Sequence, residues 1–246
     1  MWDVAQGTSF GAAADAYEAG RPEYPLEAVA WMLEGTEGTV LDLGAGTGKL
    51  TRGILALGRE VVAVDPDAAM LARLTESLPG VRAEVGTAEA VPLPDASVGA
   101  VVLGQAWHWV DVVRASREAA RVLVPGGVLG LIWNVRDERE PWMAALTGAM
   151  HGSVAEELIG AGGPEVAAPF GALEELRVEW SRPMTRDAIE AMVRSRSYFI
   201  GSDAAARAEI EGRVGAVLDD LPGLAGGGSV PAPYVTAAYR TALRGK

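Results

Sequence analysis

The chain has 246 residues, enough to bury one substantial core but short for two full domains. Its 33 acidic and 21 basic residues give a formal net charge of -12, which opposes binding to nucleic acid or anionic lipid. The absence of cysteine and the presence of only two histidines exclude disulfides, thiolate catalysis and histidine-rich metal centres. A magnesium ion bound by carboxylates is not excluded, but we expect no metal.

The start of the chain, residues 1–20, carries Asp3, Asp15 and Glu18 and lacks the basic and apolar segments of a signal peptide. No segment approaches the roughly 18 consecutive apolar residues that span a bilayer. We therefore expect a cytoplasmic protein that does not associate with membranes.

The region 39–134 alternates short β-branched runs with helical patterns, which is typical of a parallel sheet covered by helices. Because the runs are apolar almost throughout, we expect the strands to be buried on both faces. The predicted strands are 39–43, 60–65, 81–85, 97–104 and 127–133. The predicted helices between them are 47–57, 67–78 and 111–123, with Asp67 and Asp111 as caps.

After residue 134 the pattern changes to a mainly helical region. We predict in turn a helix opening at 137–141, a loop over 156–169, a strand over 173–180, helices over 186–199 and 203–221, a turn at 226–228 and a last strand over 230–243.

These elements predict one α/β domain with a seven-stranded, mostly parallel Rossmann-like sheet, helices on both faces and a small helical lid insertion. Its expected parts are an N-terminal helical cover (1–38), a core (39–134), a late strand with the lid (135–228) and a final strand (229–246).

The turn after the first predicted strand, Asp42 to Gly48, is the most informative segment. Glycines at 44, 46 and 48 let a ligand approach the backbone at the start of a helix. A dinucleotide fingerprint needs glycine three residues after Gly46, where Lys49 stands. A phosphate loop fails as well, because Leu43 and Leu50 occupy its required outer positions.

The spacing D-x-G-x-G-x-G after a first strand resembles that of the class I S-adenosylmethionine-dependent methyltransferases, and the resemblance extends over essentially the whole chain. It implies S-adenosylmethionine as cofactor and S-adenosylhomocysteine as product. It also implies that the turn wraps the methionyl half of the cofactor, with Asp42 near its amino group. The residues of the turn are Gly44, Ala45, Gly46, Thr47 and Gly48.

Later strand ends supply further candidate cofactor residues. Asp65 can accept both hydroxyls of a ribose, or can belong with Pro66 to a simple turn and helix cap. Met70 fits an apolar wall against adenine, or a place in the core. The resemblance also implies that Thr87 and Ala88 bind the adenine amino group; family members often have an acidic residue at the position of Thr87. Gln105 follows the fourth predicted strand, at the edge of the sheet where ligands bind in parallel sheets.

Within that family the chain is most similar to the trans-aconitate methyltransferase relatives. The motifs that carry this likeness are Phe10, Tyr17 to Pro25, Ala106 to Trp109, Ile132 to Asn134 and Ser195 to Tyr198. The likeness implies that Tyr17 and Arg21 reach the methionine carboxylate of the cofactor. The alternatives are core packing for Tyr17 and a surface salt bridge for Arg21.

The acceptor side is expected among aromatic and cationic residues near the ligand edge, although aromatic clusters more often only pack. His108 is a candidate general base or substrate hydrogen-bond partner, with a structural histidine as the alternative. A carboxylate acceptor would need no base but would need a cation, for which Arg136, Arg194 and Arg196 are candidates. The expected substrate contacts are Trp107, His108, Trp109, Trp133, Arg196 and Tyr198.

The sequence thus predicts methyl transfer to a small-molecule acceptor by in-line displacement, in which the protein mainly aligns the reactants. Two other functions stay open at this stage: a nicotinamide-dependent oxidoreductase, and a non-catalytic protein that binds the same cofactor. The identity of the acceptor and the oligomeric state are not readable from one sequence.

Overall fold

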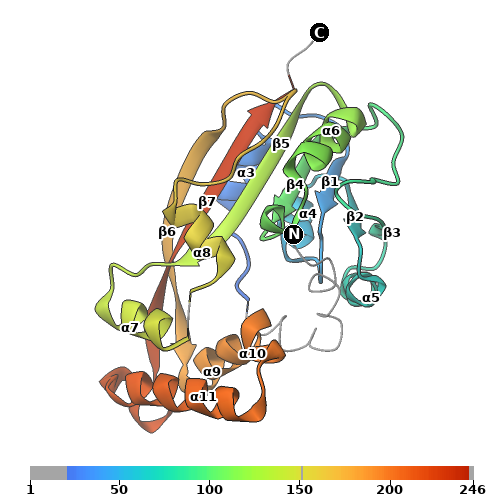
Figure 1. Ribbon diagram of the computed structural model, residues 1–246. Helices are drawn as coiled ribbons and strands as arrows, with labels where there is room; N and C mark the ends of the chain where they lie inside the picture. The colour runs from blue at the N-terminus through green and yellow to red at the C-terminus, as the bar shows by residue number, and fades with distance from the viewer. Residues whose placement is uncertain (1–20, 151, 244–246) are drawn as a thin grey trace.

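One mixed sheet of seven strands forms the centre of the molecule in the computed structural model, which describes residues 21–150 and 152–243 (Figure 1). Its order is β3-β2-β1-β4-β5-β7-β6, with β7 antiparallel to both neighbours and the other pairs parallel. The predicted seven-stranded, mostly parallel sheet is confirmed. The strands are β1 (Val40–Leu43), β2 (Val61–Asp65), β3 (Arg82–Val85), β4 (Val98–Gly104), β5 (Leu123–Arg136), β6 (Glu174–Thr185) and β7 (Ser229–Ala242).

Two hydrophobic cores cover the two faces of the sheet, because alternate residues of a strand point to opposite sides. Leu41 and Leu43 of β1 pack in the core beneath α6 (Val112–Val122) and α8 (Val154–Gly160). Val40, from the same strand, packs on the other side with α3 (Leu26–Leu33) and α4 (Lys49–Ala56). The strands are therefore apolar throughout because both faces are buried, and helices cover both faces as predicted.

The helices of this region begin where the sequence predicted caps. The side chain of Asp67 accepts hydrogen bonds from the backbone N–H groups of residues 69 and 70 and starts α5 (Ala68–Ser77). Asp111 does the same for α6 through residues 113 and 114. Each cap satisfies N–H groups that have no partner within the helix, which stabilises the helix by about 1 kcal/mol.

A second helical layer lies beyond the carboxyl ends of the parallel strands, where β6 and β7 extend past the rest of the sheet (Figure 1). This lid has its own hydrophobic core, which includes Met143, Ile189, Ile210 and Tyr234. The predicted lid insertion is therefore confirmed. Its helices are α7 (Pro141–Met150), α9 (Arg186–Arg194), α10 (Ser197–Gly201), α11 (Ala204–Asp219) and the 3-10 helix η3 (Pro222–Gly227). No helix in the described part of the chain is long and apolar enough to cross a membrane.

Several predicted boundaries were wrong. β3 is an edge strand with exposed ends rather than a strand buried on both faces. The predicted loop 156–169 begins inside α8, because Ser153 and Glu156 form a capping box that starts this helix. The single helix predicted over 186–199 is broken at residues 195 and 196, where the Ser195 hydroxyl donates to the Met192 carbonyl, 2.7 Å away.

Candidate active site

The glycine turn connects β1 to α4 in a conformation that favours glycine. Gly44, Gly46 and Gly48 have φ angles of 74°, 55° and 90°, in the left-handed region. A Cβ atom on Gly44 would lie 2.8 Å from the Cβ atom of Ala106, whereas one on Gly46 would meet nothing within 4 Å. The turn therefore needs glycine for its backbone shape and leaves open space beside Gly46 that a ligand can fill.

Asp42 lies directly beneath this turn and is fully buried. Its Oδ2 atom accepts a hydrogen bond of 2.6 Å from the Thr51 hydroxyl, while its Oδ1 atom has no partner among the described residues. Burial, followed by the nearby charge of Asp65, raises the pKa of Asp42 to about 7. A buried carboxylate oxygen without a partner fits a ligand ammonium group, and Asp42 lines a small cavity together with Arg21 and the turn.

Asp65 ends β2, and its carboxylate joins the turn to the next helix. Its Oδ2 atom accepts from the Gly46 N–H at 2.9 Å, and its Oδ1 atom accepts from the Asp67 N–H at 2.8 Å. Burial raises the pKa of Asp65, and the two backbone hydrogen bonds oppose this shift. Each carboxylate oxygen can accept a second hydrogen bond. The geometry thus shows the turn that the sequence offered as one alternative, and it leaves acceptor sites on Asp65 for the ligand contact that remains a prediction.

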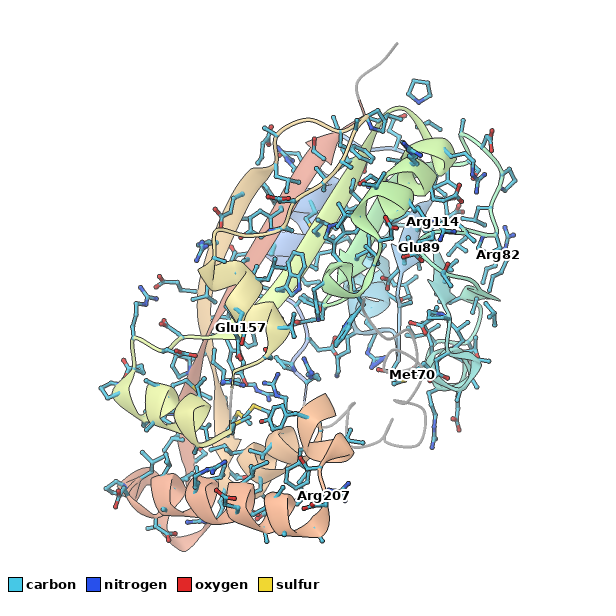
Figure 2. The ribbon with its side chains drawn as sticks, in the orientation of Figure 1. Met70, Arg82, Glu89, Arg114, Glu157 and Arg207 are labelled. Atoms are coloured by element: carbon cyan, nitrogen blue, oxygen red, sulfur yellow. The ribbon has the colours of Figure 1, made fainter. Side chains whose placement is uncertain are left out.

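A cavity of about 1410 Å³ opens at this end of the sheet, between the strand ends, α6, α8 and the lid. Figure 2 labels three of its lining residues: Met70 on α5, Glu89 after β3 and Arg114 on α6. Met70 is 4% exposed, so it serves both the core and the cavity wall. The predicted cofactor residues in this wall are Arg21, Gly44, Gly46, Asp65, Pro66, Met70, Thr87, Ala88 and Gln105.

Gln105 marks the end of β4 with an unusual backbone. Its φ angle of 56° lies in the left-handed region, although it is not glycine. Two contacts to β5 hold it there: its N–H donates to the Ile132 carbonyl at 2.9 Å, and its side-chain amide donates to the Asn134 carbonyl at 2.8 Å. Strained residues of this kind cluster at functional sites, and Gln105 lines both cavities.

The aromatic residues after β4 divide into core and cavity residues. Trp107 is 2% exposed, and its indole N–H donates to the Glu165 carbonyl at 2.8 Å. Trp133 in β5 is fully buried. Because neither side chain lies in the cavity wall, the substrate contacts predicted for these two residues are withdrawn. His108 and Trp109 do line the cavity, with ring centroids 4.8 Å apart.

Two buried arginines and one glutamate lie where α8 and the lid meet the cavity. Arg136, at the end of β5, donates to Glu156 Oε2 at 2.8 Å and to the Thr147 hydroxyl at 3.0 Å. Burial, followed by the charge of Arg196, lowers the pKa of Arg136 to about 10. Although burial alone would raise the pKa of Glu156, both arginines keep it below its ordinary value. Arg196 and Tyr198 lie in the cavity wall.

Other predicted residues have different positions. Arg194 is an exposed residue that pairs with Glu190 and Glu211, so it is not a candidate for the acceptor site. Tyr17 lies outside the described residues. Sequence reasoning missed Glu156, although the S-x-x-E spacing from Ser153 is a known helix-start signal. It also missed that Asn134 joins β5 to β7: the Asn134 Oδ1 atom accepts a hydrogen bond of 2.6 Å from the Thr236 hydroxyl.

Comparisons with known proteins identify the family of this chain. Residues 41–131 match the family model described as methyltransferase domain. An uncharacterised methyltransferase of Mycobacterium tuberculosis is 47% identical over 241 residues, covering 96% of this chain and 96% of the relative. The chain belongs to the methyltransferase family.

Solved structures show the same fold. One from Anaeromyxobacter dehalogenans, described as a candidate type II methyltransferase, has a TM-score of 0.62 at 25% identity and covers 92% of this chain and 99% of that chain. The Haemonchus contortus phosphoethanolamine N-methyltransferase 2, solved with S-adenosylhomocysteine, has a TM-score of 0.52 at 17% identity and covers 96% of this chain and 58% of that one. The protein is an S-adenosylmethionine-dependent methyltransferase.

Proposed function

We propose that this methyltransferase transfers the methyl group to a carboxylate oxygen of a small molecule. Arg196 carries the proposal: it is 7% exposed, it lines the large cavity, and its Nε atom has no hydrogen-bond partner among the described residues. Leaving a buried guanidinium N–H without a partner is costly. A ligand carboxylate, which can accept two parallel N–H bonds from arginine, is the matching partner.

The charge balance around Arg196 supports the same conclusion. Glu156 already accepts from Arg136 and from both the N–H and the hydroxyl of Ser153. One carboxylate therefore faces two buried guanidinium groups, which leaves about one positive charge beside the cavity. An anionic acceptor would neutralise this charge in a site of low dielectric, where the attraction is stronger than in water.

The chemistry of ester formation suits the groups present. S-adenosylmethionine supplies a methyl group that its sulfonium charge has already activated. A carboxylate oxygen that attacks the methyl carbon forms an ester while the carbon–sulfur bond breaks, and no proton has to be removed. The carboxylates in the cavity wall, Asp65, Glu89 and Asp111, each accept hydrogen bonds from backbone N–H groups, so each already has a structural role in this wall.

The cofactor contacts follow from the strand ends. We assign the methionyl part to the turn, with Asp42 Oδ1 for its amino group and Tyr17 and Arg21 for its carboxylate. We assign the nucleoside part to the strand ends that follow. The assigned residues are Asp42, Gly44, Ala45, Gly46, Thr47, Gly48, Asp65, Pro66, Met70, Thr87, Ala88 and Gln105.

Two further observations support a small carboxylic acid as the acceptor. The motifs that resemble the trans-aconitate methyltransferase relatives include Arg196 and Tyr198 themselves. The formal net charge of -12 makes nucleic acid an unfavourable substrate.

A transfer assay with methyl-labelled S-adenosylmethionine tests the proposal. The panel pairs small mono-, di- and tricarboxylates with the corresponding amides, and adds phenols and amines. We expect label only with carboxylates, released as methanol by mild alkali because the product is an ester. Methylation of phenols, amides or amines without methylation of any carboxylate would refute the proposal.

The matched variants are Arg196→Gln and Arg194→Gln. Losing charge-assisted hydrogen bonds should reduce kcat/KM of the first variant by about 10- to 150-fold, mainly through KM. The second variant, two residues away but exposed and paired with Glu190 and Glu211, should keep its activity. Equal losses in both variants would show that the cavity position of Arg196 does not matter.

A further inference from the structure

A hydrogen bond joins Trp133 in the sheet to His108 in the segment that follows the neighbouring strand. Trp133 lies in β5, and His108 lies in the short 3-10 helix η2 (Trp107–Trp109) that follows β4. The Nε1 atom of Trp133 lies 3.3 Å from the Nδ1 atom of His108. An indole N–H can only donate, so Nδ1 must be the acceptor and cannot carry a proton. In a neutral imidazole the proton is then on Nε2.

We propose that Trp133 is a positioning residue that fixes His108 in the Nε2–H tautomer, so that the imidazole offers the acceptor a hydrogen-bond donor and not a base. The proposal rests on the proposed function in one respect, because it places the acceptor beside His108 in the cavity. It goes further by assigning a role to a residue that does not touch the cavity.

The surroundings of His108 keep the ring neutral. Burial, followed by the positive charge of Arg21, lowers the pKa of His108 to about 4. Protonation would also put an N–H on Nδ1 directly opposite the indole N–H and break the hydrogen bond. Since Trp133 is fully buried, its indole N–H would then have no partner in the described surroundings, and such a loss is costly.

This arrangement restricts the acceptors that the site can use. Nδ1 is occupied by the indole, and Nε2 already carries a proton, so His108 cannot remove a proton from an alcohol, a phenol or an ammonium group. It can donate a hydrogen bond to an oxygen that is already anionic. Trp133 therefore acts on specificity through His108, at a distance from the methyl acceptor.

Nitrogen-15 NMR of the enzyme with bound S-adenosylhomocysteine tests the tautomer directly. The chain has two histidines, so a His151→Gln variant assigns the signals of His108. Between pH 6 and 8 we expect His108 to show an unprotonated Nδ1, a protonated Nε2 and a scalar coupling across the hydrogen bond to Trp133 Nε1. A protonated Nδ1 in this range would overturn the proposal.

The Trp133→Phe variant keeps an aromatic ring but removes the donor. We expect the His108 signals to move toward a mixture of the two tautomers, a change that packing alone would not produce. Unchanged tautomer signals in a folded variant would overturn the proposal. If this variant does not fold, the scalar coupling between His108 and Trp133 in the unmodified enzyme tests the proposal instead. Absence of that coupling would show that the hydrogen bond does not form and would overturn the proposal.

Kinetics separate a donor from a base, using the carboxylate that the panel identifies as the best substrate. The amide N–H of His108→Gln takes the place of Nε2–H, whereas His108→Ala removes it. We expect the Gln variant to keep at least tenfold more activity than the Ala variant, and equal activities would count against a donor. The NMR result needs no acceptor, so it can stand or fail independently of the carboxylate proposal.

Discussion

Replacing Asp42 with Asn should stabilise the enzyme without cofactor at alkaline pH and weaken cofactor binding. Burial raises the pKa of Asp42 from 3.8 to about 7. Between these two values the folded chain holds one proton more than the unfolded chain, so stability falls as pH rises. At about 1.4 kcal/mol per pH unit over roughly three units, the ionised carboxylate costs the fold up to about 4 kcal/mol above pH 7.

Asn removes this pH-dependent cost and adds a smaller constant one. Its amide oxygen can still accept from the Thr51 hydroxyl, which now lies 2.6 Å from Oδ2. Its NH2 group takes the place of the unpartnered Oδ1 atom, and a buried donor without a partner costs about 1–3 kcal/mol. The variant should therefore be about 1–3 kcal/mol more stable than the unmodified enzyme at pH 8, and this difference should be about 2.5 kcal/mol smaller at pH 5.

Urea unfolding at pH 5, 6.5 and 8 measures the stability of both proteins, with the exposed Asp220→Asn as a control whose stability difference should not change with pH in this way. Calorimetry with S-adenosylhomocysteine should show about 10- to 100-fold weaker binding to the Asp42 variant, because a charge-assisted hydrogen bond is lost. A stability difference that stays constant from pH 5 to pH 8 would refute the reasoning about Asp42.

Three further predictions concern the turn and the arginine cluster. Gly44 has a φ of 74°, and a Cβ atom added there would lie 2.8 Å from Ala106. The Gly44→Ala variant should therefore lower the free energy of unfolding by about 1–3 kcal/mol and abolish binding of S-adenosylhomocysteine in calorimetry. Gly148→Ala, on an exposed helix position, should instead gain about 0.5–1 kcal/mol, and equal effects would contradict the role of the turn. Glu156→Ala leaves two buried arginines without their carboxylate and should lose about 3–5 kcal/mol in urea unfolding; a loss under about 1 kcal/mol would contradict the pairing. Ser153→Ala removes the cap of α8 and should lower the free energy of unfolding in urea by about 1 kcal/mol. An unchanged free energy of unfolding would show that the capping box does not form.

The sheet was predictable because each central strand is a short apolar run that carries its own signal. The strands predicted over 39–43 and 60–65 correspond to β1 and β2. Both strands are buried along their whole length, which is why their residues are almost all apolar. β3 pairs on one side only, so Arg82 and Val85 are exposed at its ends. Two of its four residues, Arg82 and Glu84, are charged, which is typical of an edge strand, but its place at the edge also depends on the order of the strands in the sheet.

The meeting of the candidate cofactor residues in one cavity was predictable for a different reason. These residues lie on the backbone turn and at the carboxyl ends of parallel strands, and these ends meet at one edge of any such sheet. Asp65, Thr87 and Gln105 therefore reach one cavity although 40 positions separate the first from the last. The acceptor side depends on which way single side chains point. Trp107 points into the core while His108, the next residue, faces the cavity.

The same reasoning explains how a methyltransferase can work with so few reactive side chains. Among the described cavity residues, each carboxylate accepts from backbone N–H groups, and the imidazole of His108 accepts from Trp133. These groups thus already make hydrogen bonds within the protein, whereas the Arg196 Nε atom, which can only donate, is left without a partner among the described residues. Under the proposed function the acceptor needs no deprotonation, because it reaches the site as a carboxylate. We therefore propose that acceptor specificity follows from the guanidinium group that the protein leaves without an internal partner.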